Sequence, residues 1–195
     1  MPLPRQLLSV QVAGARRVVI DGRSVLTAMP KRPVNGPVQV LPLGLAGDEQ
    51  ADLSIHGGLE KAVYAYPAEH YPFWRKARCE QGLDPIDDCL PFGSLGENLT
   101  VQGLLESELW AGDVLKFPHC ELLVRIPREP CYKFNAAMGF ARASKRMAQS
   151  GFCGFYLSVL TSGTLRAGES FELLPGRRSV SIAQLFAAKM SKHLR

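Results

Sequence analysis

Short apolar segments, each ended within a few residues by glycine or proline, make up most of this sequence. The 195 residues include 18 glycines and 14 prolines, and both residue types favour turns over long helices. Hydrophobic residues account for 46% of the chain and charged residues for 21%, which is enough apolar material for a packed core. We therefore expect a globular, mostly β protein, and neither a disordered tail nor a small disulfide scaffold.

The apolar pattern predicts strands along most of the chain and helices in a few places. Residues 18–20 and 24–28 flank Asp21-Gly22, a pair that favours the tight turn of a hairpin. Further strands are expected at residues 7–12, 38–45, 62–66, 99–101, 114–117, 122–126, 155–160 and 170–174, and helices at 67–78, 140–149 and 182–190. Many short strands with few helices predict a β-barrel with helical decorations, residues 1–176, and a C-terminal helical extension, residues 177–195. That helix is expected to pack on the barrel or to serve a partner chain.

The balance of charges is moderately basic, with 23 Lys and Arg against 18 Asp and Glu. The basic residues are scattered and do not alternate with aromatic residues, so we expect no nucleic-acid partner. A solvated basic surface and a preference for an anionic ligand such as a phosphate both stay open. Five cysteines without a Cys-x-x-Cys pair argue against a disulfide framework and a structural zinc site. With no signal-peptide pattern and no run of about 18 apolar residues, we expect a cytoplasmic protein that does not enter a membrane.

Two glycine-containing segments are candidates for ligand binding. His56-Gly57-Gly58 permits a sharp turn and close approach of the backbone to a ligand, and Lys61 adds a positive charge nearby. A plain Gly-Gly turn explains the same residues. Residues 92–99, which include Asn98, could present backbone N–H groups to an anion, although the P-loop pattern is absent. A tight structural loop is the alternative for this second segment.

Cys131 is the candidate reactive cysteine. It follows a proline and lies between Arg128 and Lys133 in the sequence. Neighbouring cations favour the thiolate, which is both the nucleophile and the form that binds soft metals. Cys120 and Cys153 instead sit beside apolar segments and are expected in the core. A purely structural role for Cys131 stays open.

Taken together, five motifs resemble those of the MOSC family, the molybdenum-cofactor-sulfurase C-terminal-type domains, and are most similar to its YiiM-like stand-alone branch. The motifs are residues 26–34, Gly47-Asp48 with Ala51-Asp52, His56-Gly57-Gly58 with residues 61–63, Gly96-Glu97-Asn98-Leu99, and Pro130-Cys131. Each is weak alone, but their order and spacing are specific, and the resemblance covers residues 16–174. It implies a mostly antiparallel β-barrel. Members of the branch usually end in a compact helical subdomain, whereas residues 177–195 leave room for one helix.

The resemblance also implies a ligand and the residues that bind it. The ligand is the molybdenum cofactor, a phosphorylated molybdopterin, and Cys131 is the catalytic residue whose thiolate binds molybdenum. Retention of the cofactor in purified protein is not implied. The charges of Lys31, Arg128 and Lys133 would suit the phosphate, and Asn135 would offer hydrogen bonds. The implied cofactor-binding residues are Thr27, Lys31, His56, Gly57, Gly58, Lys61, Asn98, Arg128, Lys133 and Asn135.

The leading expectation for function is a molybdenum-dependent oxidoreductase that reduces N-hydroxylated compounds. N-hydroxylated purines and amidoxime-like molecules are the small-molecule substrates implied, in a detoxifying role. The chain has no flavin, haem or iron–sulfur motif, so the electrons would come from a separate donor protein. One alternative is a non-catalytic carrier of the cofactor or of a Cys131 persulfide. Another is a hydrolase using Cys131 and His56, which must then lie within hydrogen-bond reach. The amphipathic C-terminal helix leaves a homodimer open.

Overall fold

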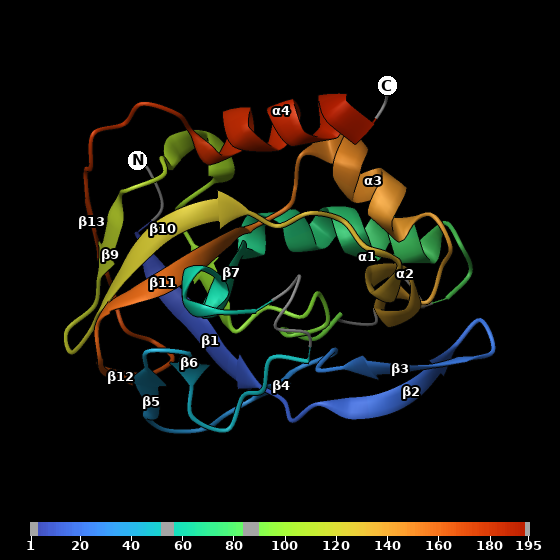
Figure 1. Cartoon of the computed structure of the whole chain (residues 1–195), viewed down its shortest axis with the longest axis horizontal. Helices are drawn as coiled ribbons and strands as arrows, with labels where there is room; N and C mark the ends of the chain where they lie inside the picture. The colour runs from blue at the N-terminus through green and yellow to red at the C-terminus, as the bar shows by residue number, and fades with distance from the viewer. Residues whose placement is uncertain (1–3, 52–56, 84–89, 194–195) are drawn as a thin grey trace.

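The structure is a computed structural model that describes residues 4–51, 57–83 and 90–193. Its largest element is a sheet of eight strands (Figure 1). These are β1 (Gln6–Val12), β4 (Arg32–Pro33), β7 (Val63–Pro67), β8 (Leu99–Gln102), β9 (Val114–Lys116), β10 (Glu121–Pro127), β11 (Phe155–Thr161) and β13 (Glu172–Leu174). The order across the sheet is β13-β9-β10-β11-β7-β8-β1-β4. Every pair is antiparallel except β7 and β8, which are parallel.

The sheet curls so that its first strand approaches the segment that leads into its last one. The backbone N–H of Leu7 in β1 donates a hydrogen bond to the carbonyl oxygen of Glu169 at 2.8 Å. Gln6 and Ser170 form an isolated antiparallel bridge. No continuous ladder joins β13 to β4 within the described residues. The mostly β prediction is confirmed, whereas closure into a barrel is not.

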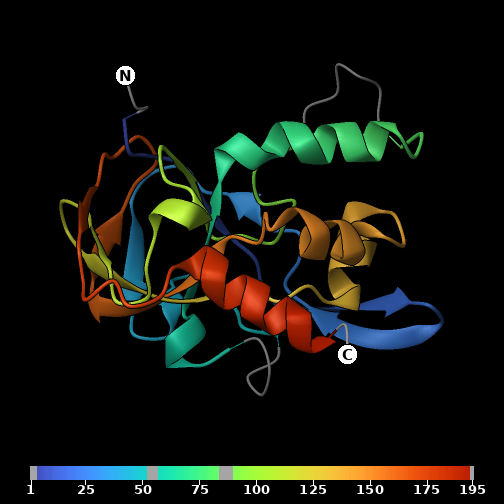
Figure 2. The same cartoon turned by 90° about the horizontal axis from the view of Figure 1, so that it is seen from above.

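Two smaller sheets complete the β structure. The predicted hairpin is confirmed as β2 (Arg16–Ile20) and β3 (Arg23–Thr27). Asp21 and Gly22 both have positive φ in its turn, and the hairpin projects from one end of the molecule (Figures 1 and 2). The single strand expected at residues 38–45 is instead two strands, because the chain reverses in a turn at Pro42 and Leu43. These are β5 (Val38–Leu41) and β6 (Gly44–Leu45), which pair with each other, and β12 (Gly163–Leu165) pairs with β5.

In the described part of the chain, four α-helices pack on the sheet: α1 (Tyr71–Cys79), α2 (Tyr132–Met138), α3 (Ala143–Ser150) and α4 (Ile182–His193). Short 3-10 turns occur at η1 (Leu59–Lys61), η2 (Ala68–His70) and η3 (Glu106–Glu108). The helix expected at 67–78 begins as η2 and continues as α1. The helix expected at 140–149 is α3, whereas α2 was not predicted. None of the described helices is long and apolar enough to cross a membrane.

The core has two parts. One lies inside the curled sheet and includes Leu99 and Leu122, while the other lies between the sheet and the helices and includes Trp74 and Phe134. Cys120 and Cys153 are buried in these two parts, as expected. Helix α4 contributes Ile182 to the first part and Phe186 to the second. The C-terminal helix therefore packs on the body of the protein.

Candidate functional site

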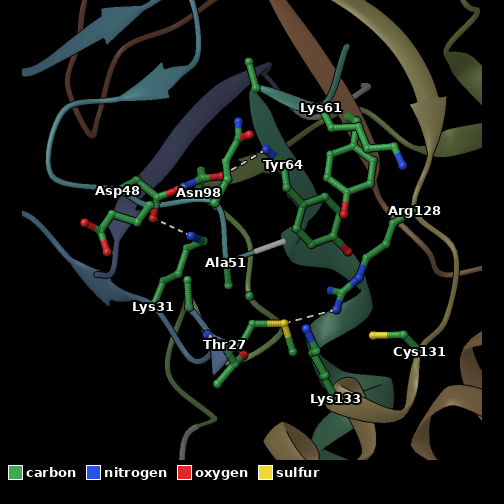
Figure 3. A pocket seen from close by; sticks show the side chains of 17 residues that line it. Thr27, Lys31, Asp48, Ala51, Lys61, Tyr64, Asn98, Arg128, Cys131 and Lys133 are labelled. Carbon is green, nitrogen blue, oxygen red and sulfur yellow. Dashed lines mark hydrogen bonds and ion pairs between the residues drawn. The ribbon is translucent and has the colours of Figure 1, made fainter. Parts of the chain in front are cut away.

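An open pocket lies where the end of β3, the start of β7, the end of β10 and helix α2 meet (Figure 3). It encloses about 640 Å³ of empty space, including the part open to solvent. The structure brings seven of the expected site residues together in its lining. They are Thr27, Lys31, Lys61, Asn98, Arg128, Cys131 and Lys133. Segments separated by more than one hundred residues in the sequence thus form one cavity.

Lys31 and Asp48 form a buried ion pair on one wall of the pocket, each side chain being 7% exposed. Asp48 also accepts hydrogen bonds from the backbone N–H of Ala13 and from Asn98 Nδ2, both at 2.9 Å. Burial lowers the pKa of Lys31, and the attraction of Asp48 offsets part of that shift. Because Lys31 faces the pocket as half of a neutral pair, its charge is less available to a phosphate than the sequence suggested.

Arg128 is a buried cation on the opposite wall (Figure 3). Its Nη1 donates a hydrogen bond to the carbonyl oxygen of Leu95, and its Nη2 lies 3.3 Å from the sulfur of Met29. The guanidinium carbon lies 4.8 Å from the ring centroid of Tyr64 and 5.0 Å from that of Phe134. Two aromatic faces and two acceptors therefore fix a positive charge beside the pocket.

Cys131 is half-buried at the residue that precedes helix α2. Its backbone is extended, and its carbonyl oxygen accepts a hydrogen bond from the N–H of Phe134 at 3.0 Å. Figure 3 shows the thiol turned toward the same part of the pocket as the ends of Arg128 and Lys133. A thiol among cations is the setting in which the thiolate is favoured.

The glycine-rich segment at residues 92–99 does not present a row of backbone donors to the pocket. The Gly93 N–H bonds to Glu97 Oε1 at 2.7 Å, and the Gly96 N–H bonds to the carbonyl oxygen of Gly93 at 3.0 Å. The Asn98 N–H bonds to the carbonyl oxygen of Tyr64 at 2.8 Å. These donors are used inside the protein, so the structure favours the tight loop over the anion site.

The side chain of Asn98 is hydrogen-bonded within the protein and connects the segments that form the pocket. Its Oδ1 accepts from the Tyr64 N–H at 3.1 Å, and its Nδ2 donates to Asp48 and to the carbonyl oxygen of Gln11. Asn135 lies outside the lining and accepts a hydrogen bond from the Ser144 N–H at 2.7 Å, at the start of α3.

The remaining expected residues do not line the pocket or cannot be placed. Gly57 and Gly58 are not part of the lining. Gly58 has a φ of 89° and donates its N–H to Gln50 Oε1 at 2.6 Å. His56 lies outside the described residues, so the proposed approach of His56 to Cys131 stays a prediction.

Among the lining residues that sequence reasoning did not assign to ligand binding are Asp48, Tyr64 and Tyr156. Asp48 belongs to a recognised motif, but no local pattern indicates that it pairs with Lys31. The two tyrosines were expected only as strand residues. Their ring centroids lie 5.2 Å apart, and Lys61 Nζ lies 5.9 Å from the ring centroid of Tyr156.

The comparisons with known proteins agree with the sequence motifs. The MOSC domain profile matches residues 52–172, which is more than half of the chain. This protein therefore belongs to the MOSC domain family, as the motifs predicted.

Individual relatives support the same placement. The chain is 36% identical to the uncharacterized protein YflK of Bacillus subtilis over 188 residues, covering 96% of this chain and 80% of YflK. It is 34% identical to a reductase of Gibberella moniliformis over 174 residues, covering 89% of this chain but 30% of the reductase. The crystal structure of YiiM from Geobacillus stearothermophilus superposes with a TM-score of 0.77 at 28% identity, covering 98% of this chain and 87% of YiiM. The fold is thus YiiM-like.

Proposed function

We propose that this protein binds a molybdenum–pterin cofactor in the pocket, with the Cys131 thiolate as a metal ligand, and reduces N-hydroxylated compounds. One observation carries the proposal: the Cys131 thiol lines an open pocket beside Arg128 and Lys133. Membership of the MOSC family and similarity to a protein named a reductase support an oxidoreductase.

The residues of the pocket fit such a cofactor in their chemistry. A thiolate is a soft donor and suits a metal that the pterin already holds through sulfur. The cofactor carries a phosphate, and Lys61 and Lys133 bring positive charge to the lining. Lys31 and Asn98 are occupied by Asp48, so we assign them to shaping the cavity and not to holding the phosphate.

When bound, the cofactor would supply the two-electron chemistry that removes the hydroxyl oxygen. Overall, the N–O bond of the substrate is broken with two electrons and two protons, which leaves an N–H group and one molecule of water. A separate donor protein supplies the electrons. The protein binds and orients the reactants.

Two cysteine variants test the metal ligand. Cys131→Ser removes the proposed donor, and Cys79→Ser is the matched control, because Cys79 is also half-buried but lies on α1 away from the lining. We expect protein made in a cofactor-competent host to contain molybdenum in the wild type and in Cys79→Ser, and to lose it in Cys131→Ser. Equal molybdenum content in all three would contradict the assignment.

A turnover assay tests the reaction. Cofactor-loaded wild-type protein with a reduced viologen dye is expected to convert an N-hydroxylated purine to the parent purine. Molybdenum bound through Cys131 without turnover on several N-hydroxylated compounds would favour the cofactor carrier instead. Mass spectrometry of Cys131 would identify a persulfide, the signature of a sulfur carrier.

A further inference from the structure

Glu97 is a fully buried carboxyl group just behind the pocket, and it is not part of the lining. Its Oε1 accepts hydrogen bonds from the Tyr71 hydroxyl, from the Gly93 N–H at 2.7 Å and from the Thr100 hydroxyl at 3.0 Å. One oxygen of this carboxyl group therefore holds together helix α1, strand β8 and the loop between them.

The loop that Glu97 holds touches the polar groups of the pocket. The Gly93 carbonyl oxygen accepts the Lys31 N–H at 3.0 Å, and a Cβ on Gly93 would overlap the Lys31 carbonyl group. Nothing larger than glycine fits there, so the backbone of Lys31 rests directly on Gly93.

Two more pocket residues depend on the same loop. The Leu95 carbonyl oxygen accepts a hydrogen bond from Arg128, and the Asn98 side chain donates one to Asp48 at 2.9 Å. Residues 93–98, here called the pinning loop, thus contact Lys31, Arg128 and Asp48, and two of them, Gly96 and Asn98, line the cavity themselves. A shift of the loop would displace a buried cation on each wall.

The second oxygen of Glu97 is a place where a proton could be accommodated. Glu97 Oε2 and Gln11 Oε1 are both buried acceptors without a hydrogen-bond partner in the described structure. Both side chains bond to one atom, Thr100 Oγ1, Gln11 Nε2 at 2.9 Å and Glu97 Oε1 at 3.0 Å. A proton on Oε2 would turn one of these two acceptors into a donor, which lessens the cost of burying unpaired polar atoms.

We propose that Glu97 is a positioning residue of the pocket: its buried carboxyl group fixes the pinning loop against Tyr71 and thereby sets the places of Lys31, Arg128 and Asp48. This inference deepens the proposed function, on which its meaning for catalysis rests. Protein without cofactor is used to test it, so a wrong cofactor assignment and a wrong role for Glu97 give different results.

The electrostatic setting agrees with a proton on Glu97. Burial raises its pKa, while hydrogen bonds from Tyr71 and Gly93 act in the opposite direction. Lys31, on the pocket side, also attracts Glu97, and this attraction favours the charged carboxylate and so opposes the effect of burial. Tyr71, on the α1 side, stays a hydrogen-bond donor to Glu97, because burial raises the pKa of its hydroxyl.

Comparing Glu97→Gln with Glu97→Ala distinguishes a protonated carboxyl group at Glu97 from an ionised one. Glutamine keeps the shape, the acceptor and a donor in place of the protonated oxygen, so we expect it to retain the fold of the loop at neutral pH. In Glu97→Ala we expect hydrogen exchange of the Lys31 and Gly93 amides to accelerate by about tenfold or more, because buried hydrogen bonds are lost. Glu172→Gln on β13 is the control, since Glu172 is exposed.

The pH profile of stability tests whether Glu97 carries a proton, whereas exchange of the Lys31 amide tests whether Glu97 positions that pocket residue. A carboxyl group with a raised pKa in the folded protein stabilises it fully below the unfolded pKa of about 4.3. That contribution is lost as the pH rises through the folded-state pKa. The urea midpoint of the wild type is thus expected to fall relative to that of Glu97→Gln as the pH rises from about 5 to about 9, and the wild type and Glu172→Gln are expected to stay parallel.

Tyr71→Phe is the second test variant if Glu97→Ala does not fold, because it removes the hydroxyl that donates to Glu97 and keeps the aromatic ring. It is expected to accelerate exchange of the Gly93 and Lys31 amides as well. The inference is overturned if Glu97→Gln exchanges as fast as Glu97→Ala, which would require a charged carboxylate. It is equally overturned if the Lys31 amide keeps wild-type protection in Tyr71→Phe and Glu97→Ala.

Discussion

Replacing Asp48 by asparagine would leave the Lys31 ammonium buried without its counter-charge. Removing one partner of a buried ion pair typically costs about 3–5 kcal/mol. Asp48 accepts hydrogen bonds on both of its oxygens, from Lys31, Ala13 and Asn98, so the new NH2 group must face a donor in either orientation. Burial already lowers the pKa of Lys31, and the amine can therefore lose its proton. We expect a cost near the lower end of that range, about 3 kcal/mol.

The reverse change, Lys31→Met, is expected to cost less. Methionine keeps much of the apolar stem and removes the charge. Asp48 would retain two N–H donors, the Ala13 backbone and Asn98 Nδ2, both at 2.9 Å. With those bonds intact, the loss should be about 2 kcal/mol, within the range for one hydrogen bond to a charged group.

Urea unfolding at pH 7 of the wild type, both single variants and the double variant measures these costs. The double variant is expected to be more stable than the sum of the single costs predicts, by roughly 1–3 kcal/mol of coupling. Equal slopes against urea concentration would show that the four proteins unfold from the same compact state. The reasoning fails if Lys31→Met costs as much as Asp48→Asn, or if the two costs simply add.

Two further predictions concern packing and thiol chemistry. Gly154→Ala should destabilise the protein by about 3 kcal/mol or more, because its Cβ would lie 2.6 Å from a backbone oxygen of β7. Gly151→Ala is the control, since Gly151 has a similar φ with open space around it, and it should cost about 1 kcal/mol. Similar urea midpoints for the two variants would contradict the packing argument. Brief alkylation of native protein at pH 8 should modify Cys131 and leave Cys120 and Cys153 unmodified by peptide mass spectrometry, because burial raises the pKa of Cys120 to about 12 and that of Cys153 well above its usual value. Modification of the two core thiols at the rate of Cys131 would count against it.

The mostly β fold was predictable because its signals are local. Glycine and proline end the strands wherever the chain turns, and Asp21-Gly22 specified a hairpin that the structure contains. Helix α2 was missed because its seven residues are too few for a helical period to show, and they follow a proline corner that hides the start. Closure of the sheet depends on pairing between distant segments, which local patterns do not contain.

The residues of the pocket were partly predictable for a related reason. The order of the motifs identified the family and predicted Lys31, Arg128 and Cys131 as site residues. Motifs do not say which partners a side chain has after folding, so the neutral pair of Lys31 with Asp48 was not foreseen. Asn135 looked like a ligand by its chemistry, yet its oxygen is used at the start of α3.

The pocket draws its lining from residues as far apart in the chain as Thr27 and Tyr156. No single segment contains enough of it to hold a ligand, so binding is available only to the fully folded protein. A ligand that binds there therefore stabilises the folded state of the whole chain. At a free ligand concentration about one hundred times its dissociation constant, the free energy of unfolding would rise by about 2.7 kcal/mol. Screening compounds by the shift in melting temperature is thus a direct route to the natural occupant, with no activity assay needed.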